Sequence, residues 1–324
     1  MVFYQGAYLL SLDGTGYFSS KKLHSPFCLE KTDSNGTATY HLQMLGAVIV
    51  HPDMKTVIPL MPEIISKEDG KDKNDCERNA AKRFLEKLRK DHPHLNLIVT
   101  QDSLSPNAPH IRELQKHRLH FILRVKEGDH TFLFNRVDEA VAKKQTTEFG
   151  LEDDKGVYHF FRFINNVPLN ASNQDVEVNF LEYWELTGDQ DLNHFSWVTD
   201  FTLSEDNAFT IMRGARAYWK VENEGFNTLK NQGYHFGHNY GLGKKYLSMI
   251  FVMLMMLAFL VDQTQQLCCR LFQSVHQKLG SKRALWDRFR AMIYDFALES
   301  MRIVYLALLH GYQRQPPRIY NDSS

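Results

Sequence analysis

The sequence predicts an α/β fold in which a mixed sheet is flanked by helices. Its first 130 residues run as three strands, a helix, a strand, a second helix and a strand, an order typical of α/β proteins. Residues 131–200 then alternate apolar and polar positions with the period of two that strands show. Helical periodicity returns at Glu205 and continues to about Tyr312, with a break over 233–243.

The first three strands follow from apolar, β-prone runs separated by turn residues. Residues 7–18 predict a strand that enters a glycine-containing turn at Asp13-Gly14. Residues 40–50 and 56–60 predict two further strands, and the segment between Pro52 and Lys55 suits a hairpin connection. We therefore expect these three strands to be neighbours in one sheet.

Residues 73–92 predict an amphipathic helix, because their apolar side chains recur on one face. Asn74 or Asp75 is the expected N-cap, and the basic last turn agrees with the helix dipole. A buried strand, a second helix and a strand complete this half of the chain, over 95–102, 110–117 and 120–126.

The β-rich region is either an insertion or a continuation of the first sheet. Its predicted strands lie at 130–137, 157–164, 176–186 and 194–201. Four regions follow from these patterns. They are the first part of a core (1–130), the β-rich region (131–200), a core helix (201–245) and a C-terminal helical region (246–324).

Composition limits the class of protein without naming a function. With 324 residues, of which 43% are hydrophobic and 23% charged, the chain is not a disordered or low-complexity protein. Its 38 basic residues balance 38 acidic ones, so net charge gives no support for nucleic-acid binding, although local patches decide such binding. Only four cysteines are present, which indicates a reducing, intracellular setting.

The most apolar run, Tyr246 to Val261, predicts a buried core helix. It is shorter than the roughly 20 residues that cross a bilayer, and it contains Ser248. A membrane span is the alternative. The opening MVFYQGAYLLSLDG has no basic region of the kind that begins a signal peptide. We therefore expect a cytoplasmic protein without a membrane segment.

Three acids occupy positions that invite a functional interpretation. Asp13 and Asp102 each follow an apolar run and precede a loop, where α/β folds place site residues. On a helical wheel of residues 211–230, Glu222 lies within the apolar stripe, between Tyr218 and Phe226. Turn formation by either Asp, and a salt bridge by Glu222, are the alternatives.

Together the three carboxylates would form an oxygen-rich site suited to Mg²⁺ or Mn²⁺. Such a site can hold two ions about 3.5–4 Å apart and promote in-line attack on a phosphodiester. The sequence thus makes Asp13, Asp102 and Glu222 candidate catalytic and metal-binding residues.

Six segments carry a resemblance to a known family. In chain order they read LLSLDGTGYFSS, NDCERNAAKR, LIVTQDSLSPNAPHI, VKEGDH, FSWVTD and YWKVENEGFNTLKNQGYHFGHNYGLG. As a set they resemble the DDE transposases of bacterial insertion sequences, in particular those like insertion sequence four. The resemblance implies a ribonuclease H-like catalytic core with a β-rich insertion between the second Asp and the Glu. It also implies that Asp13, Asp102 and Glu222 are the three metal-binding acids.

The chain departs from the family's pattern at several positions. Tyr218 stands where the family has an Arg, and Lys230 follows one residue later than the family's Lys. Gly237 and Leu242 stand where a Glu and a His are more usual. Asp13 comes so early that most of the family's N-terminal DNA-recognition region is expected to be missing.

Basic residues around Glu222 predict a DNA-facing surface. The candidate DNA contacts are Arg213, Arg216, Lys220, Lys230, His235, His238 and Lys244. The resemblance implies double-stranded DNA as partner, both element ends and target. It further implies a homodimer on DNA and a bacterial, nucleoid-associated location.

Three functional hypotheses remain. The first is a transposase that cleaves strands at insertion-sequence ends and transfers them, with Mg²⁺ or Mn²⁺ as cofactor. The second is a truncated, inactive remnant that at most binds DNA. The third is a stand-alone ribonuclease H-fold nuclease that cuts DNA without regard to element ends.

Overall fold

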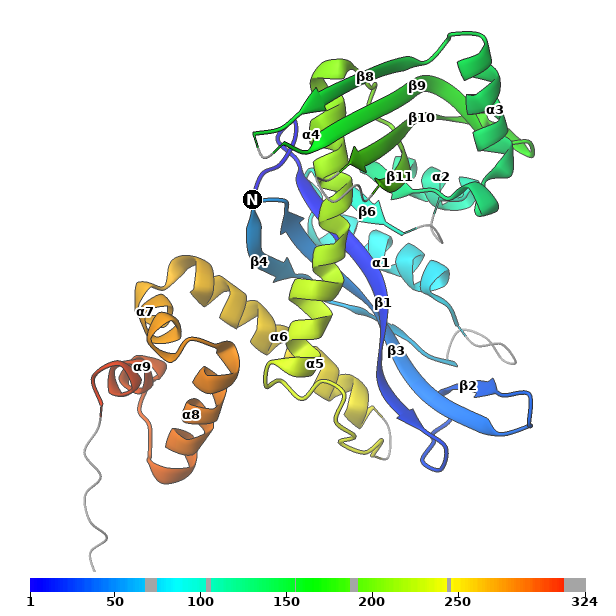
Figure 1. The fold of residues 1–324 in the computed structure, drawn as a ribbon. Coiled ribbons are helices and arrows are strands. Elements are labelled where there is room, and N and C mark those ends of the chain that lie inside the picture. Colours follow the sequence, from blue (N-terminus) through cyan, green and yellow to red (C-terminus); the bar gives the residue numbers. More distant parts are fainter. Residues whose placement is uncertain (68–74, 103–105, 155, 187–191, 244–245, 312–324) are drawn as a thin grey trace, which may run out of the picture.

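The computed structural model describes residues 1–67, 75–102, 106–154, 156–186, 192–243 and 246–311 (Figure 1). The strands are β1 Tyr8–Ser20, β2 Leu29–Thr32, β3 Ala38–His51, β4 Met54–Pro59, β5 Glu63–Ile65, β6 Leu97–Gln101, β7 His120–Arg124, β8 Thr147–Glu152, β9 Tyr158–Asn170, β10 Asn173–Leu186 and β11 Leu192–Thr199. The α-helices are α1 Glu77–Asp91, α2 Ala108–Lys116, α3 Thr131–Ala142, α4 Glu205–Arg216, α5 Asn227–Asn231, α6 Leu247–Cys268, α7 Arg270–Leu279, α8 Lys282–Asp295 and α9 Met301–His310. Short 3₁₀ turns η2 Glu127–Asp129 and η3 Ala217–Trp219, and the π-helix η4 Val221–Phe226, complete the described elements.

Eleven strands of the described residues form one mixed sheet, which confirms the α/β class. Strand β1 pairs antiparallel with β3 and parallel with β6, and β6 pairs parallel with β7. Strand β11 joins β7 antiparallel, and β10, β9 and β8 follow outward from it. The β-rich region is thus hydrogen-bonded to the first sheet and continues it.

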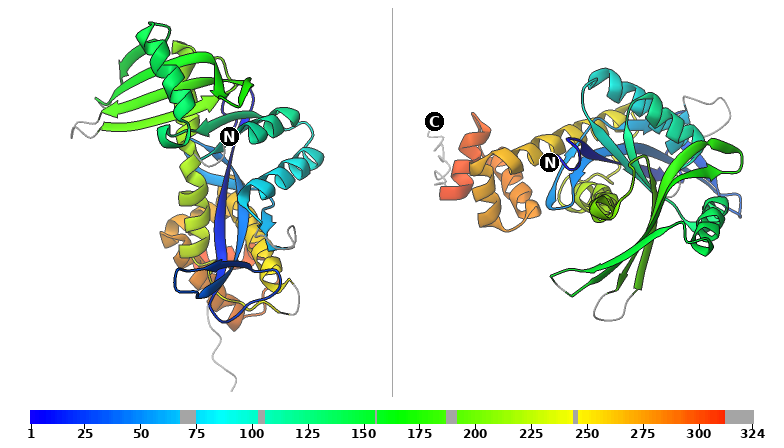
Figure 2. Two further views of the ribbon diagram at one scale, coloured as in Figure 1. Left: turned by 90° about the vertical axis from the view of Figure 1, so that its right-hand side faces the viewer. Right: turned by 90° about the horizontal axis from the view of Figure 1, so that it is seen from above.

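Helices cover both faces of the sheet. Helices α1, α2 and α3 pack on one face around a core that includes Leu10, Leu12, Leu85, Ile111 and Phe180. On the other face α4, the segment that follows it and α6 enclose a second core. Figure 2 shows α4 to α5 as a long helical segment that crosses this second face. Helices α7, α8 and α9 have a separate small core of their own.

Most of the predicted elements are present, and two details differ. The hairpin between β3 and β4 is confirmed. Strand β1 does not turn at Asp13-Gly14 but continues to Ser20, because Asp13 pairs with Gly46 and Gly14 with Leu45. Helix α1 begins at Glu77, with Cys76 and not Asp75 at its N-cap and no side-chain cap hydrogen bond. The expected start at residues 73–74, with the N-cap candidate Asn74, lies outside the described residues.

The strand predicted at 130–137 is wrong, since this segment forms helix α3. Its buried side chains Leu133, Phe134, Val137 and Ala140 recur with helical spacing and pack toward β9 and β10. The phenylalanines raised the β-propensity of the segment, but the helical spacing of the buried positions decided its structure.

The expectation that residues 246–261 form a buried helix is only half right. Helix α6 buries Val252, Met256 and Phe259 against the sheet but leaves Leu254 and Leu257 more than half exposed. By length and composition, α6 is also the one described helix that could cross a membrane, with a third of its apolar window buried. Its contact with β4 and its buried Asp262 and Gln263 show a helix that is docked on the sheet.

Candidate functional site

Asp13 and Asp102 lie together because their strands are parallel neighbours in register. Ser11 of β1 is opposite Thr100 of β6, and the two buried hydroxyl oxygens are 2.9 Å apart. Asp13 comes two residues after Ser11 on β1, and Asp102 comes two residues after Thr100, directly past the end of β6. Since side chains alternate with a period of two, both carboxylates leave the sheet on the same face and at the same level. The sequence-based expectation that these two acids converge agrees with this geometry.

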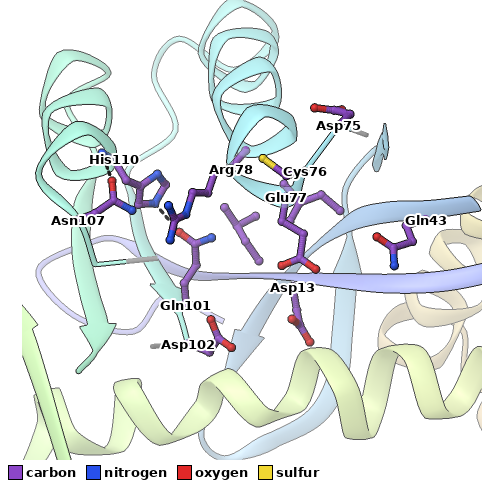
Figure 3. Close-up of a pocket in the computed structure, with 13 residues that line it drawn as sticks. Asp13, Gln43, Asp75, Cys76, Glu77, Arg78, Gln101, Asp102, Asn107 and His110 are labelled. Atoms are coloured by element: carbon purple, nitrogen blue, oxygen red, sulfur yellow. Dashed lines mark hydrogen bonds between the residues drawn. The ribbon is translucent and has the colours of Figure 1, made fainter. Parts of the chain in front are cut away.

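Both acids line a cavity of about 410 Å³ between the sheet and the first turns of α1 and α2 (Figure 3). The remaining lining side chains are mixed apolar and polar: Leu12, Gln43, Leu45, Asp75, Cys76, Glu77, Arg78, Ala81, Gln101, Asn107 and His110. A concave site that gathers several titratable groups is where chemistry is most often found in a fold of this kind.

Glu77 is a third carboxylate at this site, and the sequence analysis did not single it out. It occupies the first turn of α1, and its carboxylate lies directly over Gly14. A Cβ atom on Gly14 would be 2.0 Å from Glu77 Oε1, so the position next to Asp13 needs glycine. The only sequence signal was an acid at a helix start, which is ordinarily explained by the helix dipole.

Burial and charge both act on these carboxylates. The pKa of Asp13 is raised to about 6, mainly by burial and also by the charges of Glu77 and Asp102. Hydrogen bonds from the Tyr218 hydroxyl and the Gly14 N–H lower it in part. Burial and the charge of Asp102 likewise raise the pKa of Glu77. Such crowded like charges favour either protons or metal cations.

Tyr218 contributes a neutral hydrogen-bond donor to Asp13. Its hydroxyl pKa is raised well above the ordinary value by burial and then by the charges of Asp13 and Asp102. The hydroxyl therefore stays protonated across the physiological range. The transposase resemblance implies an Arg at this position, so a neutral hydroxyl lies beside Asp13 where the family's residue would carry a positive charge.

Gln101 is fixed beside Asp102 by a side chain from α2. His110 Nε2 lies 2.5 Å from Gln101 Oε1, and the His110 backbone N–H donates to the Asn107 side chain that caps the helix. Burial lowers the pKa of His110 to about 4, so the ring is neutral at pH 7. A neutral ring donates through Nε2–H to the amide oxygen, which makes this wall of the cavity rigid.

The expectation that Glu222 faces the core is wrong. Residues 221–226 form the π-helix η4, in which Val221, Gly225 and Phe226 take the buried positions and Glu222 is exposed. A π-helix has more residues per turn than an α-helix, so the wheel of 100° per residue does not apply there. Glu222 is not among the side chains that line the described cavity.

Nevertheless, η4 is attached closely to the strand pair that carries Asp13. The Phe226 ring packs over Gly46, where a Cβ atom would be 2.5 Å from Phe226 Cε1. Gly46 is the β3 partner of Asp13. Glu222 is also four residues from Tyr218, whose hydroxyl reaches Asp13. The segment that bears Glu222 is therefore anchored beside Asp13 on both sides.

Three of the residues expected to contact DNA are instead engaged within the chain. Their partners are the Asp53 carboxylate for Arg213, the Glu185 carboxylate for Arg216 and the Met54 carbonyl oxygen for Lys220. The Arg216 guanidinium also lies 5.2 Å from the centre of the Phe195 ring. Contact with phosphates would require these interactions to be exchanged.

The other candidate contacts are more accessible. Lys230, His235 and His238 are exposed, and the Lys230 amine lies 6.0 Å from the centre of the Phe226 ring. Lys244 lies outside the described residues. Three exposed groups thus remain near the segment that carries Glu222.

The carboxylate oxygens at this site are suitable ligands for a divalent cation, although the described acidic side chains do not converge on one point. In the described ranges, no three His, Cys, Asp or Glu side chains lie close enough to hold a metal ion as they stand. Carboxylate oxygens on β1, β6 and α1 are nevertheless the hard ligands that Mg²⁺ and Mn²⁺ prefer. The raised pKa values of Asp13 and Glu77 show that a positive charge there would be stabilised.

No protein-family model and no curated protein matches the sequence. Function is therefore inferred from the site and from the six segments that resemble transposases.

Proposed function

We propose that this chain is a DDE-type transposase that cleaves and transfers DNA strands at insertion-sequence ends. The single observation that carries the proposal is the pairing of β1 with β6. It places Asp13 and Asp102 at one level of the sheet, beneath the helical segment that carries Tyr218 and Glu222. Local patterns do not force this convergence, which the resemblance requires.

The strand order supports a ribonuclease H-like core. As proposed here, that core comprises β4 and β5, β3, β1, β6 and β7, with helices α1 and α2 as the connections into β6 and β7. Strands β8 to β11 then fall between Asp102 and Glu222 in the chain, where the resemblance implies a β-rich insertion. On this interpretation, the insertion extends the core sheet through the contact of β11 with β7.

Asp13, Asp102 and Glu222 would hold the ions. When bound there, two Mg²⁺ or Mn²⁺ ions would activate the attacking oxygen and stabilise the leaving oxygen of an in-line displacement. The chain's own contribution is positioning. The Tyr218 hydroxyl and the Gly14 N–H orient the Asp13 carboxylate, and the hydrogen bond between His110 and Gln101 fixes the strand end that carries Asp102.

The proposed partners follow from the same activity. Double-stranded DNA would approach over the segment 211–245, with Lys230, His235 and His238 as accessible contacts and a homodimer formed on paired ends. The proposed setting is the bacterial cytoplasm.

A supercoiled-plasmid nicking assay with Mn²⁺ tests the chemistry. Asp13→Asn, Asp102→Asn and Glu222→Gln should each abolish nicking, while Asp206→Asn, an exposed acid in the first turn of α4, should not. Nicking that survives in any of the three variants would falsify the assignment of that acid. Preference for DNA that flanks the coding sequence over scrambled DNA separates a transposase from a stand-alone nuclease.

One observation favours the inactive remnant as second candidate. Glu222 is exposed outside the described cavity, and Tyr218 supplies no positive charge beside Asp13. A remnant would bind DNA in a salt-dependent manner. It would not nick DNA with Mn²⁺ at any pH between about 6 and about 9.

A further inference from the structure

Helix α6 is apolar on all sides, but only one of its faces is buried. From Tyr246 to Val261 the sequence has no charged residue. Val252, Met256 and Phe259 are buried on the side of the helix that packs on the sheet. A helix that is hydrophobic all round is normally buried all round. The outer face of α6 therefore needs a cover, which the part of the chain described by the structure does not provide.

The exposed side chains of α6 have the spacing of a contact between two helices. Along the helix they lie alternately three and four residues apart, the repeat by which one helix packs lengthwise on another. They are Leu247 (37% exposed), Ile250 (55%), Leu254 (54%), Leu257 (56%) and Val261 (47%). We call these five side chains the outer stripe of α6. Their spacing indicates that the missing cover is itself a helix.

A groove of about 560 Å³ adjoins the first half of the outer stripe. Met249, Ile250, Met253 and Leu254 of α6 form one wall, and Ile64 of β5 lies on the other. In packed helices, rows of side chains on one helix fill grooves of this kind beside the other. The stripe and the groove together give the relief that helix packing requires.

We propose that the outer stripe is a homodimer interface, in which α6 packs on α6 of a second copy of this chain. In a two-fold symmetric contact the same surface meets itself, so a charged stripe would repel its copy. This stripe is uncharged, which removes that repulsion. A helix that lies on a lipid surface, by contrast, carries Lys or Arg along its polar flank.

The size of the surface agrees with a dimer. At these exposures the stripe and the groove wall present on the order of 500 Å² of apolar surface, near the upper end for a monomeric protein. With a polar rim around it, such a patch approaches the roughly 800 Å² that each partner buries in a standard interface. The inference concerns the protein without DNA and does not depend on the proposed function.

Sedimentation velocity of the full chain, without DNA or metal, tests the proposal at about 0.1–50 μM. The wild-type protein should change from the 37.8 kDa protomer to a dimer as concentration rises. The double variant Leu254→Gln, Leu257→Gln should dimerise at least about a hundredfold more weakly, because each copy then places two amides in the apolar contact. Leu192→Gln is the matched control, since this leucine is 64% exposed on β11, on the far side of the sheet from β4. It should leave dimerisation unchanged.

The double variant should fold normally, because Leu254 and Leu257 are exposed in the protomer. At concentrations where both proteins are monomers, its urea midpoint should equal that of wild type. A wild-type protein that stays monomeric at about 50 μM would overturn the proposal, and so would a dimer that the double variant leaves intact.

Two further measurements assign the stripe if the protein is a monomer. Flotation with phosphatidylcholine–phosphatidylglycerol vesicles that requires Leu254 and Leu257 would assign it to a lipid surface. A Leu257→Cys thiol that a maleimide cannot reach in the monomer would assign it to another segment of this chain. Either result contradicts the homodimer.

Discussion

Substitution of Gly46 by alanine should disturb the attachment of η4 to the strand that carries Asp13. The added Cβ would lie 2.5 Å from Phe226 Cε1, about 1 Å closer than ordinary van der Waals contact. Phe226 is buried and part of η4, so it cannot swing into solvent without moving the π-helix. Overpacking of this kind costs about 1–3 kcal/mol. Reduced backbone entropy of the unfolded chain offsets about 0.4–1 kcal/mol of it.

We therefore expect Gly46→Ala to lower the free energy of unfolding by about 1–2 kcal/mol, measured by urea denaturation with circular dichroism. Gly16→Ala is the matched control on the neighbouring strand, since its Cβ would meet nothing closer than the Leu42 carbonyl oxygen at 3.9 Å. Phe226→Leu in the Gly46→Ala background should restore part of the loss by making room. A Gly46→Ala protein as stable as Gly16→Ala, within about 0.5 kcal/mol, would refute the argument that Phe226 fixes η4 on Gly46.

Three other predictions test the electrostatics and the exposed surface. Tyr218→Phe removes a hydrogen-bond donor that lowers the pKa of Asp13, so this pKa should rise above about 6. Because protons then compete with Mn²⁺ for Asp13, the Mn²⁺ affinity measured by calorimetry should fall more at pH 6 than at pH 8. Burial raises the pKa of Asp262 from 3.8 to about 6, so the folded state resists its ionisation. The free energy of unfolding should then fall by up to about 3 kcal/mol as pH rises from about 4 to 6, and urea titrations of Asp262→Asn should lack this component. Leu254→Gln on the exposed side of α6 should change stability by less than about 0.5 kcal/mol, whereas Phe259→Ala should cost about 3–5 kcal/mol, as thermal and urea unfolding can measure.

The elements that the sequence predicted correctly are those whose signals are local. The β3–β4 hairpin, helix α1 and strands β6 and β7 each carry their own periodicity or turn residues. The convergence of Asp13 and Asp102 was expected from two acids at strand ends, but only Asp102 follows a strand end, since β1 continues past Asp13 to Ser20. How closely the two side chains lie depends on which residues of β1 and β6 pair, here Ser11 with Thr100. No local sequence pattern predicts this pairing.

The features that were missed depend on tertiary context. Glu77 looks like an ordinary helix-start acid until the packing of α1 places it over Gly14. Glu222 was misplaced because the wheel assumes an α-helix, whereas the backbone of η4 is widened to a π-helix. Arg213 and Arg216 were expected to contact DNA, but each has an acidic partner more than thirty residues away in the chain. Asp53 lies in the turn between β3 and β4, and Glu185 lies on β10.

Tyr218 determines how the carboxylates can be assembled. Two unit charges 4 Å apart near a protein surface repel each other by about 4 kcal/mol at an effective dielectric constant of 20. Glu222 would meet such repulsion from both Asp13 and Asp102 on approaching them, and Glu77 adds to it. An Arg at position 218 would offset part of this energy, whereas the tyrosine hydroxyl donates a hydrogen bond without charge. Arg78 lines the same cavity, but on the side of His110, whose pKa its charge helps to lower. On the proposed function, closure of Asp13, Asp102 and Glu222 would therefore depend on bound cations more strongly than in a site that has an arginine at position 218. Mn²⁺ affinity would then separate an active enzyme from a remnant.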